Sequence, residues 1–306
     1  MEPKELQPLV AELFARGRRR SVRVAVEQEF LVADTTTGAA VPIERVRRAA
    51  AGAIAAPYVG FEPGGQLELS LPCTLDPVGQ LRTMVDDPNQ RLTAAHITTY
   101  ALPVDPRPEH DVPLQLTSPR YVAMHRHFDA IGPAGRRMMR RTASTQICLD
   151  WWPGQAGVEQ WRVLNLAGPY LAASFARSSG PHGRLTTWLE TDPARTGFDD
   201  RLLADDPVAA YTAFATAATV FTSGGPAEHL TTMFPPVRPR STYLEVRFLD
   251  AQEPAGVDAV VKALTTLMYD DVQRHKVLRR LEAGRAHLAE HWRAAAAGQL
   301  DLELVA

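Results

Sequence analysis

The strongest constraint on the fold is a strictly alternating segment that directly follows a glycine turn. In residues 62–70 (Glu-Pro-Gly-Gly-Gln-Leu-Glu-Leu-Ser), Gln66, Glu68 and Ser70 fall on one face of a strand and leucines fall on the other. Period-two alternation is typical of a sheet with one buried face and one polar face. Because the polar side carries acid, amide and hydroxyl groups, we interpret this strand as one wall of a polar site.

Three other segments, residues 22–32, 142–150 and 243–250, repeat this design. Their polar positions include Glu27, Glu29, Thr142, Ser144, Gln146, Glu245 and Arg247. One such strand alone is usually an antiparallel strand with a solvent-exposed face. If the four strands share a sheet, however, several carboxylates converge and raise one another's pKa values. A hard divalent cation such as Mg²⁺ or Mn²⁺, which prefers oxygen ligands, would relieve that repulsion.

The bulk composition excludes several classes of protein. The 306 residues are 45% hydrophobic, which is enough for a sizeable core, and the formal charge is −2. This charge argues against a nucleic-acid partner, and the two cysteines provide neither a disulfide framework nor a zinc spacing. The sequence shows no apolar leader and no run of 18 apolar residues, so we expect a cytoplasmic protein without a membrane partner. A homo-oligomer is left open.

The rest of the sequence mixes helices and strands without the regular alternation of a parallel α/β fold. Helices are predicted over 4–16, 43–56, 76–96, 120–128, 135–141, 159–176, 207–221 and 257–297. A further strand is expected over 97–103, loops over 105–117 and 177–205, and an extended, proline-rich segment over 229–243. With no repeat and no linker, we expect a single α+β domain over residues 1–306, built on an antiparallel sheet.

The motifs in these segments resemble those of the glutamate–cysteine ligases of the bacterial carboxylate–amine ligase superfamily. The similarity is greatest to the branch that opens ergothioneine biosynthesis in actinobacteria. It extends over residues 22–252, and the motifs occur in family order: VEQEF (26–30), FEPGGQLELS (61–70), GPAGRRMM (132–139), TASTQICLD (142–150), HLTTMFPPVRPR (229–240) and YLEVRFLDAQ (243–252). Several motifs are long and unusual, so chance is a poor explanation for the resemblance.

The resemblance implies the fold of glutamine synthetase. In that fold a curved antiparallel sheet forms a funnel, with helices on its convex side and with metal ions, ATP and glutamate on its concave face. The implied reaction has two steps: ATP phosphorylates the γ-carboxylate of glutamate, and an amine such as cysteine attacks the acyl phosphate to give a γ-glutamyl amide. Carboxylate-bound Mg²⁺ (or Mn²⁺) neutralises the phosphates in this chemistry. The expected partners are therefore small-molecule substrates.

Carried over residue by residue, the resemblance assigns roles to the polar positions. The expected metal ligands are Glu27, Glu29, Glu62, Glu68, Gln146 and Glu245, with Glu62 the weaker candidate because of the intervening turn. Arg247 is expected to hold the transferred phosphate, and Arg184, four residues before Trp188, to bind substrate or phosphate. The expected substrate-binding residues are Gln66, Ser70, Thr142 and Ser144.

The chain departs from the family in two loops and is shorter overall. Residues 177–184 replace a longer stretch of the family, and residues 222–228 replace a long, aromatic-bearing segment over the active site. Such loops exclude water from reactive intermediates. Four alternatives therefore stay open: a ligase that uses cysteine, a ligase that uses another amine or carboxylate in specialised metabolism, a metal-dependent enzyme that no longer uses ATP, and a non-catalytic binding protein. The retained carboxylates argue against the last.

Overall fold

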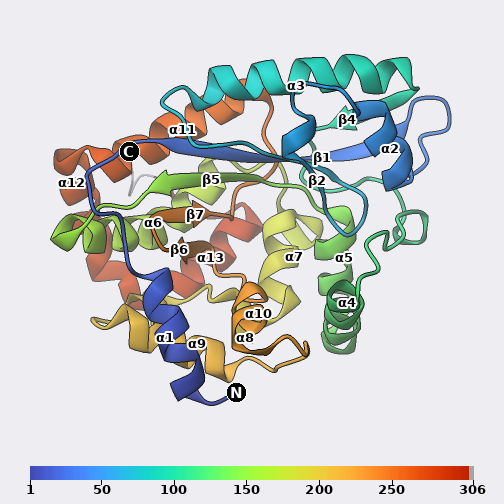
Figure 1. The fold of residues 1–306 in the computed structure, drawn as a ribbon. Coiled ribbons are helices and arrows are strands. Elements are labelled where there is room, and N and C mark those ends of the chain that lie inside the picture. The colour runs from blue at the N-terminus through green and yellow to red at the C-terminus, as the bar shows by residue number, and fades with distance from the viewer. Residues whose placement is uncertain (303–306) are drawn as a thin grey trace.

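The computed structural model describes residues 1–302. Within this range a seven-stranded sheet has the order β2-β3-β1-β5-β7-β6, and β4 pairs with the second half of β1 (Figure 1). All of these strand pairs are antiparallel, which confirms the predicted α+β class. The strands are β1 (Val24–Asp34), β2 (Val59–Phe61), β3 (Leu67–Ser70), β4 (Ile97–Tyr100), β5 (Thr145–Asp150), β6 (Val237–Arg240) and β7 (Tyr243–Val246).

Helices surround the sheet (Figure 1). They are α1 (Pro3–Leu13), α2 (Ile43–Ala50), α3 (Pro77–Ala94), α4 (Pro119–Ile131), α5 (Pro133–Arg141), α6 (Gly154–Ser174), α7 (Arg184–Thr191), α8 (Pro193–Thr196), α9 (Pro207–Ala217), α10 (Gly225–Thr231), α11 (Pro254–Tyr269), α12 (Asp271–Leu281) and α13 (Leu288–Ala297). Two predicted starts are confirmed by capping: the Asp76 and Asp206 carboxylates accept hydrogen bonds from the first turns of α3 and α9. Among the helices within residues 1–302, none combines the length and apolar character needed to cross a membrane.

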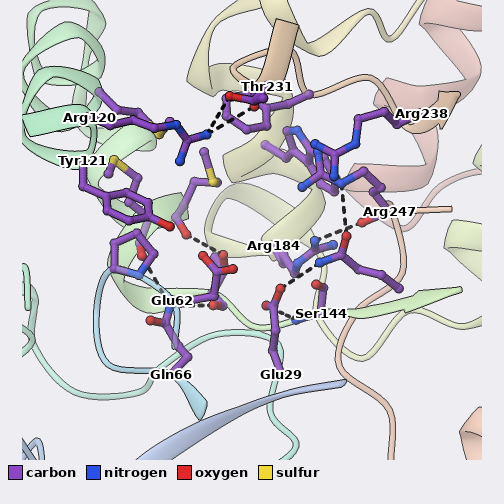
Figure 2. Close-up of a pocket in the computed structure, with 18 residues that line it drawn as sticks. Glu29, Glu62, Gln66, Arg120, Tyr121, Ser144, Arg184, Thr231, Arg238 and Arg247 are labelled. Atoms are coloured by element: carbon purple, nitrogen blue, oxygen red, sulfur yellow. Dashed lines mark hydrogen bonds between the residues drawn. The ribbon is translucent and has the colours of Figure 1, made fainter. Parts of the chain in front are cut away.

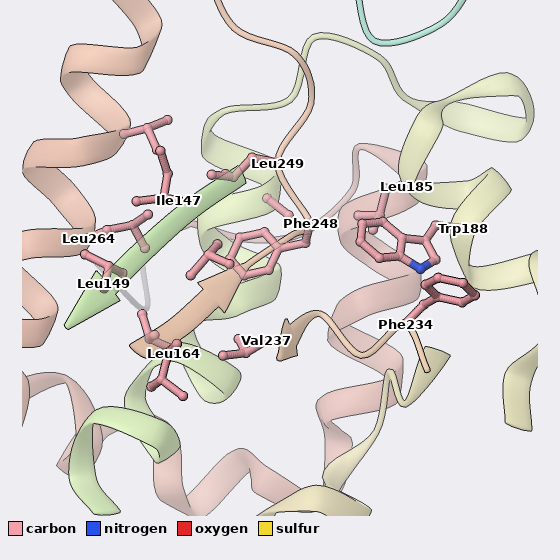
Figure 3. Close-up of a cluster of buried hydrophobic side chains, with 14 of the residues drawn as sticks. Ile147, Leu149, Leu164, Leu185, Trp188, Phe234, Val237, Phe248, Leu249 and Leu264 are labelled. Carbon is pink, nitrogen blue, oxygen red and sulfur yellow. The ribbon is translucent and has the colours of Figure 1, made fainter. Parts of the chain in front are cut away.

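The apolar face of the sheet forms the main core. Ile147 and Leu149 of β5 point toward Leu164 of α6 and Leu264 of α11, and all four side chains are completely buried (Figure 3). Burying a side chain of this size contributes about 1.5–3 kcal/mol. Because the leucines and valines of the alternating strands are taken up by this core, the opposite face is left for polar side chains.

The register between strands places the predicted polar residues opposite one another on adjacent strands. Glu29 of β1 lies opposite Glu68 of β3, and Glu27 lies opposite both Ser70 of β3 and Gln146 of β5. In the pairing between β5 and β7, Cys148 lies opposite Glu245. The four alternating segments therefore share one sheet, which is the condition under which their carboxylates were expected to converge.

Several predicted elements need correction. The helix expected over 257–297 is divided into α11, α12 and α13, and the helix expected over 207–221 ends at Ala217. The segment 177–205, expected to be a loop, contains α7 and α8, because Leu185 and Trp188 of α7 are buried in the core while Gly183 and Asp192 only mark the helix boundaries. The extended segment expected to start at residue 229 begins inside α10. The helix expected over 43–56 ends at Ala50, and the strand expected over 97–103 ends at Tyr100.

Candidate functional site

The glycine turn before β3 is fixed by close backbone contacts. A Cβ atom at Gly64 would lie 2.2 Å from the carbonyl oxygen of Arg140, and Gly65 has a φ of +89°, in the left-handed region. The side-chain oxygen of Gln66 accepts a hydrogen bond from the Gly64 amide at 2.9 Å, and its nitrogen donates to the Thr142 carbonyl at 2.8 Å. Gln66 therefore ties the turn to the segment between α5 and β5.

A cavity of about 210 Å³ opens on the polar face of the sheet (Figure 2). Side chains from β1, β5, α4, α5, α7 and β6 form its walls. The predicted site residues that line it are Glu29, Glu62, Gln66, Thr142, Ser144, Gln146, Arg184 and Arg247. Of the remaining predicted residues, Ser70 is exposed on the neighbouring strand, and Glu27, Glu68 and Glu245 lie on the strands around the cavity.

Three carboxylates meet beside this cavity, and two of them, Glu29 and Glu62, line it. Oxygen atoms of Glu29, Glu62 and Glu68 lie within 4.8 Å of one another. Burial raises the pKa of Glu62 to about 7, and the charge of Glu29 adds to this effect. Burial also raises the pKa of Glu68 to about 9, with further contributions from Glu62 and Glu29. A group made only of carboxylate oxygens, destabilised in its charged form, fits a hard divalent cation such as Mg²⁺.

The other two predicted acidic ligands have different partners. Burial, followed by the charge of Glu245, raises the pKa of Glu27, and the thiol of Cys148 lies 3.8 Å from a Glu27 oxygen. Glu245 is 2% exposed and binds Arg238 through hydrogen bonds of 2.7 and 2.9 Å and Arg247 at 2.8 Å. Burial opposes ionisation of Glu245, but the two arginines outweigh it and lower the pKa. Glu245 thus belongs to an arginine cluster, and its role as a metal ligand stays a prediction.

Gln146 connects the acidic group to the arginine cluster. Its side-chain nitrogen donates to Glu29 Oε1 at 3.0 Å, and its side-chain oxygen accepts from Arg247 Nε at 3.1 Å. A carboxylate only accepts and a guanidinium only donates, so this amide orientation is the one that satisfies both neighbours. The Ser144 amide donates to the second Glu29 oxygen at 2.7 Å. Gln146 and Ser144 together fix the Glu29 carboxylate at the cavity wall.

Arg184 and Arg247 have buried guanidinium nitrogens with unused hydrogen-bonding capacity. Arg184 is 6% exposed, donates to the Arg247 carbonyl at 3.1 Å and lies 4.8 Å from the ring centre of Trp188. Nε and Nη1 of Arg184 and Nη1 of Arg247 have no hydrogen-bond partner within residues 1–302. Burial lowers the pKa of both arginines. Buried, unsatisfied guanidinium groups fit a phosphate or carboxylate ligand, which would accept these hydrogen bonds.

The sequence argument missed two residues of α4, Arg120 and Tyr121. Both line the cavity, and Arg120 donates to the carbonyl and hydroxyl oxygens of Thr231 at 3.3 and 3.2 Å, which joins α4 to α10 across the cavity (Figure 2). The sequence offered one sign that Arg120 belongs with other cavity residues: Met124 follows it by four residues, so both lie on one face of a helix. Nothing in the sequence showed that this face borders the site.

Comparisons with known proteins identify the family of this chain. The glutamate–cysteine ligase family 2 profile matches residues 23–303. The chain is 32% identical over 292 residues to the glutamate–cysteine ligase EgtA of Mycolicibacterium smegmatis, covering 80% of this chain and 67% of that protein. EgtA of Mycobacterium tuberculosis H37Rv is 30% identical over 262 residues (70% and 60%), and a chloroplastic glutamate–cysteine ligase of Medicago truncatula is 27% identical over 266 residues (72% and 52%). The chain thus spans about half to two thirds of the length of these relatives.

Proposed function

Because the chain belongs to glutamate–cysteine ligase family 2, we propose that it is an ATP-dependent ligase that joins the γ-carboxylate of glutamate to an amine. The observation that carries the proposal is the placement of opposite charges around one cavity. Three clustered carboxylates lie beside the cavity, and Arg184 and Arg247, whose unpartnered nitrogens are buried, line it. Phosphoryl transfer depends mainly on positioning and charge stabilisation, and this arrangement offers both.

The chain's own residues take the following roles in this proposal. Glu29, Glu62 and Glu68 would hold Mg²⁺ (or Mn²⁺), which when bound neutralises phosphate charge. Arg184 and Arg247 bind the oxygens of the phosphoryl group as it moves from ATP to the γ-carboxylate of glutamate. In this step the bond to the ADP oxygen breaks and a bond to a carboxylate oxygen forms. Glu27, Gln146 and Glu245 remain proposed further ligands.

The second step releases the phosphate. The amine nitrogen attacks the acyl carbon, phosphate leaves, and the proton of the amine is lost to the surroundings. Thr142 and Ser144 on β5 and its approach, together with Gln66 and Ser70, are proposed to contact the substrates. Arg120 and Tyr121 add a cation and a phenol at the opposite wall. In this interpretation the curved, funnel-shaped sheet of glutamine synthetase supplies the arrangement, and ergothioneine biosynthesis is the proposed setting.

A second candidate function differs in the acceptor. The chain spans 67%, 60% and 52% of the length of three relatives whose names include glutamate and cysteine. Its segment 218–231 consists of a short connector, residues 218–224, followed by α10. Since this segment borders the cavity through Thr231, a rebuilt connector favours an amine or carboxylate other than those named for the relatives. A metal-dependent enzyme without ATP would keep the carboxylates but would leave the unpartnered arginine nitrogens unexplained.

One experiment tests these proposals. Purified protein is incubated with ATP, Mg²⁺, glutamate and a panel of amines that includes cysteine, while ADP and product mass are followed. We expect glutamate-dependent ADP formation and a γ-glutamyl product, both lost in Glu68→Ala and kept in Glu44→Gln, which alters an exposed acid on α2. Calorimetry that detects metal binding but no ATP binding would refute both ligase candidates.

A further inference from the structure

The short connector after α9 is held by a cluster that we call the clamp: His127, Asp192, Arg195 and Phe221. The ring of Phe221 stacks on His127, with centres 4.6 Å apart and planes inclined by 23°, and the Arg195 guanidinium lies 4.4 Å from the ring centre of Phe221. His127 Nε2 and Arg195 Nε both lie 3.0 Å from the same oxygen of Asp192. The clamp therefore joins three separate parts of the chain.

The clamp is largely shielded from solvent, and its polar groups are paired. The Arg195 side chain is completely buried, and those of Asp192 and His127 are 9% and 15% exposed. Arg195 also donates to the Thr219 carbonyl and, at 2.6 Å, to the Thr232 hydroxyl. A desolvated ion pair has a fixed geometry only when its hydrogen bonds are satisfied, as they are here. The connector is thus anchored at defined points.

Two helices that border the cavity are in contact with this clamp. On α4, Arg120 and Met124 line the cavity, and His127 follows Arg120 by seven residues, so the three lie along one stripe of the helix. On α10, Thr231 lines the cavity, and the adjacent Thr232 accepts from Arg195. Helices α4 and α10 are therefore linked twice, directly through Arg120 and Thr231 and indirectly through the clamp.

We propose that the clamp is a positioning device that holds α4 and α10 together over the cavity and so keeps water from the acyl phosphate. In this chain it takes the place of a longer covering loop. The proposal rests on the proposed ligase function. With α4 and α10 held, the acyl carbon is attacked by the amine nitrogen; with them loosened, water attacks the same carbon and releases glutamate and phosphate. Loosening the clamp therefore uncouples ADP formation from amide formation.

The test compares two substitutions of one residue. His127→Leu removes the hydrogen bond to Asp192, whereas His127→Gln keeps a donor near the position of Nε2. The matched control is His275→Leu, which removes a His–carboxylate pair of the same length, 3.0 Å, between α12 and α6 on another part of the molecule. Wild type should form ADP and amide in equal amounts. His127→Leu should form more ADP than amide and show a raised KM for the amine, and His127→Gln and His275→Leu should resemble wild type.

Hydrogen exchange gives a readout that does not depend on activity. In His127→Leu the amides of α4 and α10 should exchange about tenfold faster than in wild type, the effect of losing one hydrogen bond to a charged group, while those of α12 stay unchanged. If His127→Leu does not fold, Phe221→Leu, which keeps an apolar side chain, is tested in the same way. Equal ADP and amide with unchanged exchange in the folded variant would overturn the proposal. A wild type that forms no ADP refutes the ligase function, and the exchange comparison still decides the role of the clamp.

Discussion

The stability of the metal-free protein should depend on pH through Glu68. Its pKa in the folded protein rises from 4.5 to about 9, first because the side chain is buried and then because Glu62, Glu29 and Glu27 lie nearby. Between these two values the folded protein binds a proton that the unfolded chain has lost. The free energy of unfolding therefore falls as the pH rises through this window.

The size of the effect follows from the same pKa values. Between pH 5 and pH 7 a group with these values lowers the free energy of unfolding by up to about 2.5 kcal/mol. Glu68 keeps some contact with solvent, so we expect about 1–2.5 kcal/mol. Glu68→Gln replaces the titrating acid by a neutral amide of the same shape. From pH 5 to pH 7, the free energy of unfolding of the variant should therefore fall by about 1–2.5 kcal/mol less than that of wild type, although we expect the variant to lose its activity.

The assay is urea denaturation at pH 5 and pH 7 in the presence of EDTA. Wild type, Glu68→Gln and the surface control Glu44→Gln are compared, and the control should follow wild type. Adding Mg²⁺ at pH 7 should stabilise wild type and leave Glu68→Gln nearly unchanged, because a ligand stabilises only the state that binds it. An identical loss of stability from pH 5 to pH 7 in wild type and Glu68→Gln would refute the reasoning.

Three further predictions concern the arginine cluster and the turn. Glu245→Gln should lower the free energy of unfolding by about 3–5 kcal/mol in chemical denaturation, because it leaves Arg238 and Arg247, which are 16% and 14% exposed, without their buried carboxylate. Arg184→Met should lower kcat/KM about 100-fold or more in steady-state kinetics, while the melting temperature stays unchanged or rises, since a buried guanidinium with unpartnered nitrogens is replaced by an apolar chain. Gly64→Ala should cost at least about 2 kcal/mol in the same denaturation assay, because its Cβ would collide with a carbonyl oxygen of α5.

For each of these three predictions, one result would contradict the reasoning. A Glu245→Gln protein as stable as wild type would show that the arginines find other partners. A marked loss of melting temperature in Arg184→Met would assign that residue to folding and not to ligand binding. Full stability of Gly64→Ala would mean that the turn can move away from α5, and the close approach would then not explain the glycine.

The sheet and its polar face could be predicted because both depend on a local pattern. Alternation with period two fixes which side chains share a face, and burial of Leu67 and Leu69 fixes which face turns inward. Gln28 is an exception to this alternation and shows what the pattern alone cannot predict. It falls on the valine side of β1, yet it is buried and accepts a hydrogen bond from the Thr145 hydroxyl, its neighbour in the register. Such a pair is visible only when the register is known.

The other side of the cavity depends on contacts between distant segments. Helix α7 lies in a stretch rich in Gly, Pro and Asp, and it forms because Trp188 and Leu185 are buried, which overrides local preference. The link between His127 and Asp192 spans 65 residues and has no local signal. Arg120 could be placed on a helix face but not in a site. The position of these helices and contacts around the cavity could therefore not be predicted from local sequence patterns.

Gln146 shows how the two charged parts of the site depend on each other. The sheet places the acids of β1 and β3 beside the arginine of the β7 segment, with β5 between them. A carboxylate at position 146 would add a charge to the three that already repel one another, and a cation there would compete with the metal. A neutral amide can accept from Arg247 and donate to Glu29 at once. A ligand that moves Arg247 should therefore also change the hydrogen bond that orients Glu29, which couples the proposed anion-binding arginines to the proposed metal-binding carboxylates.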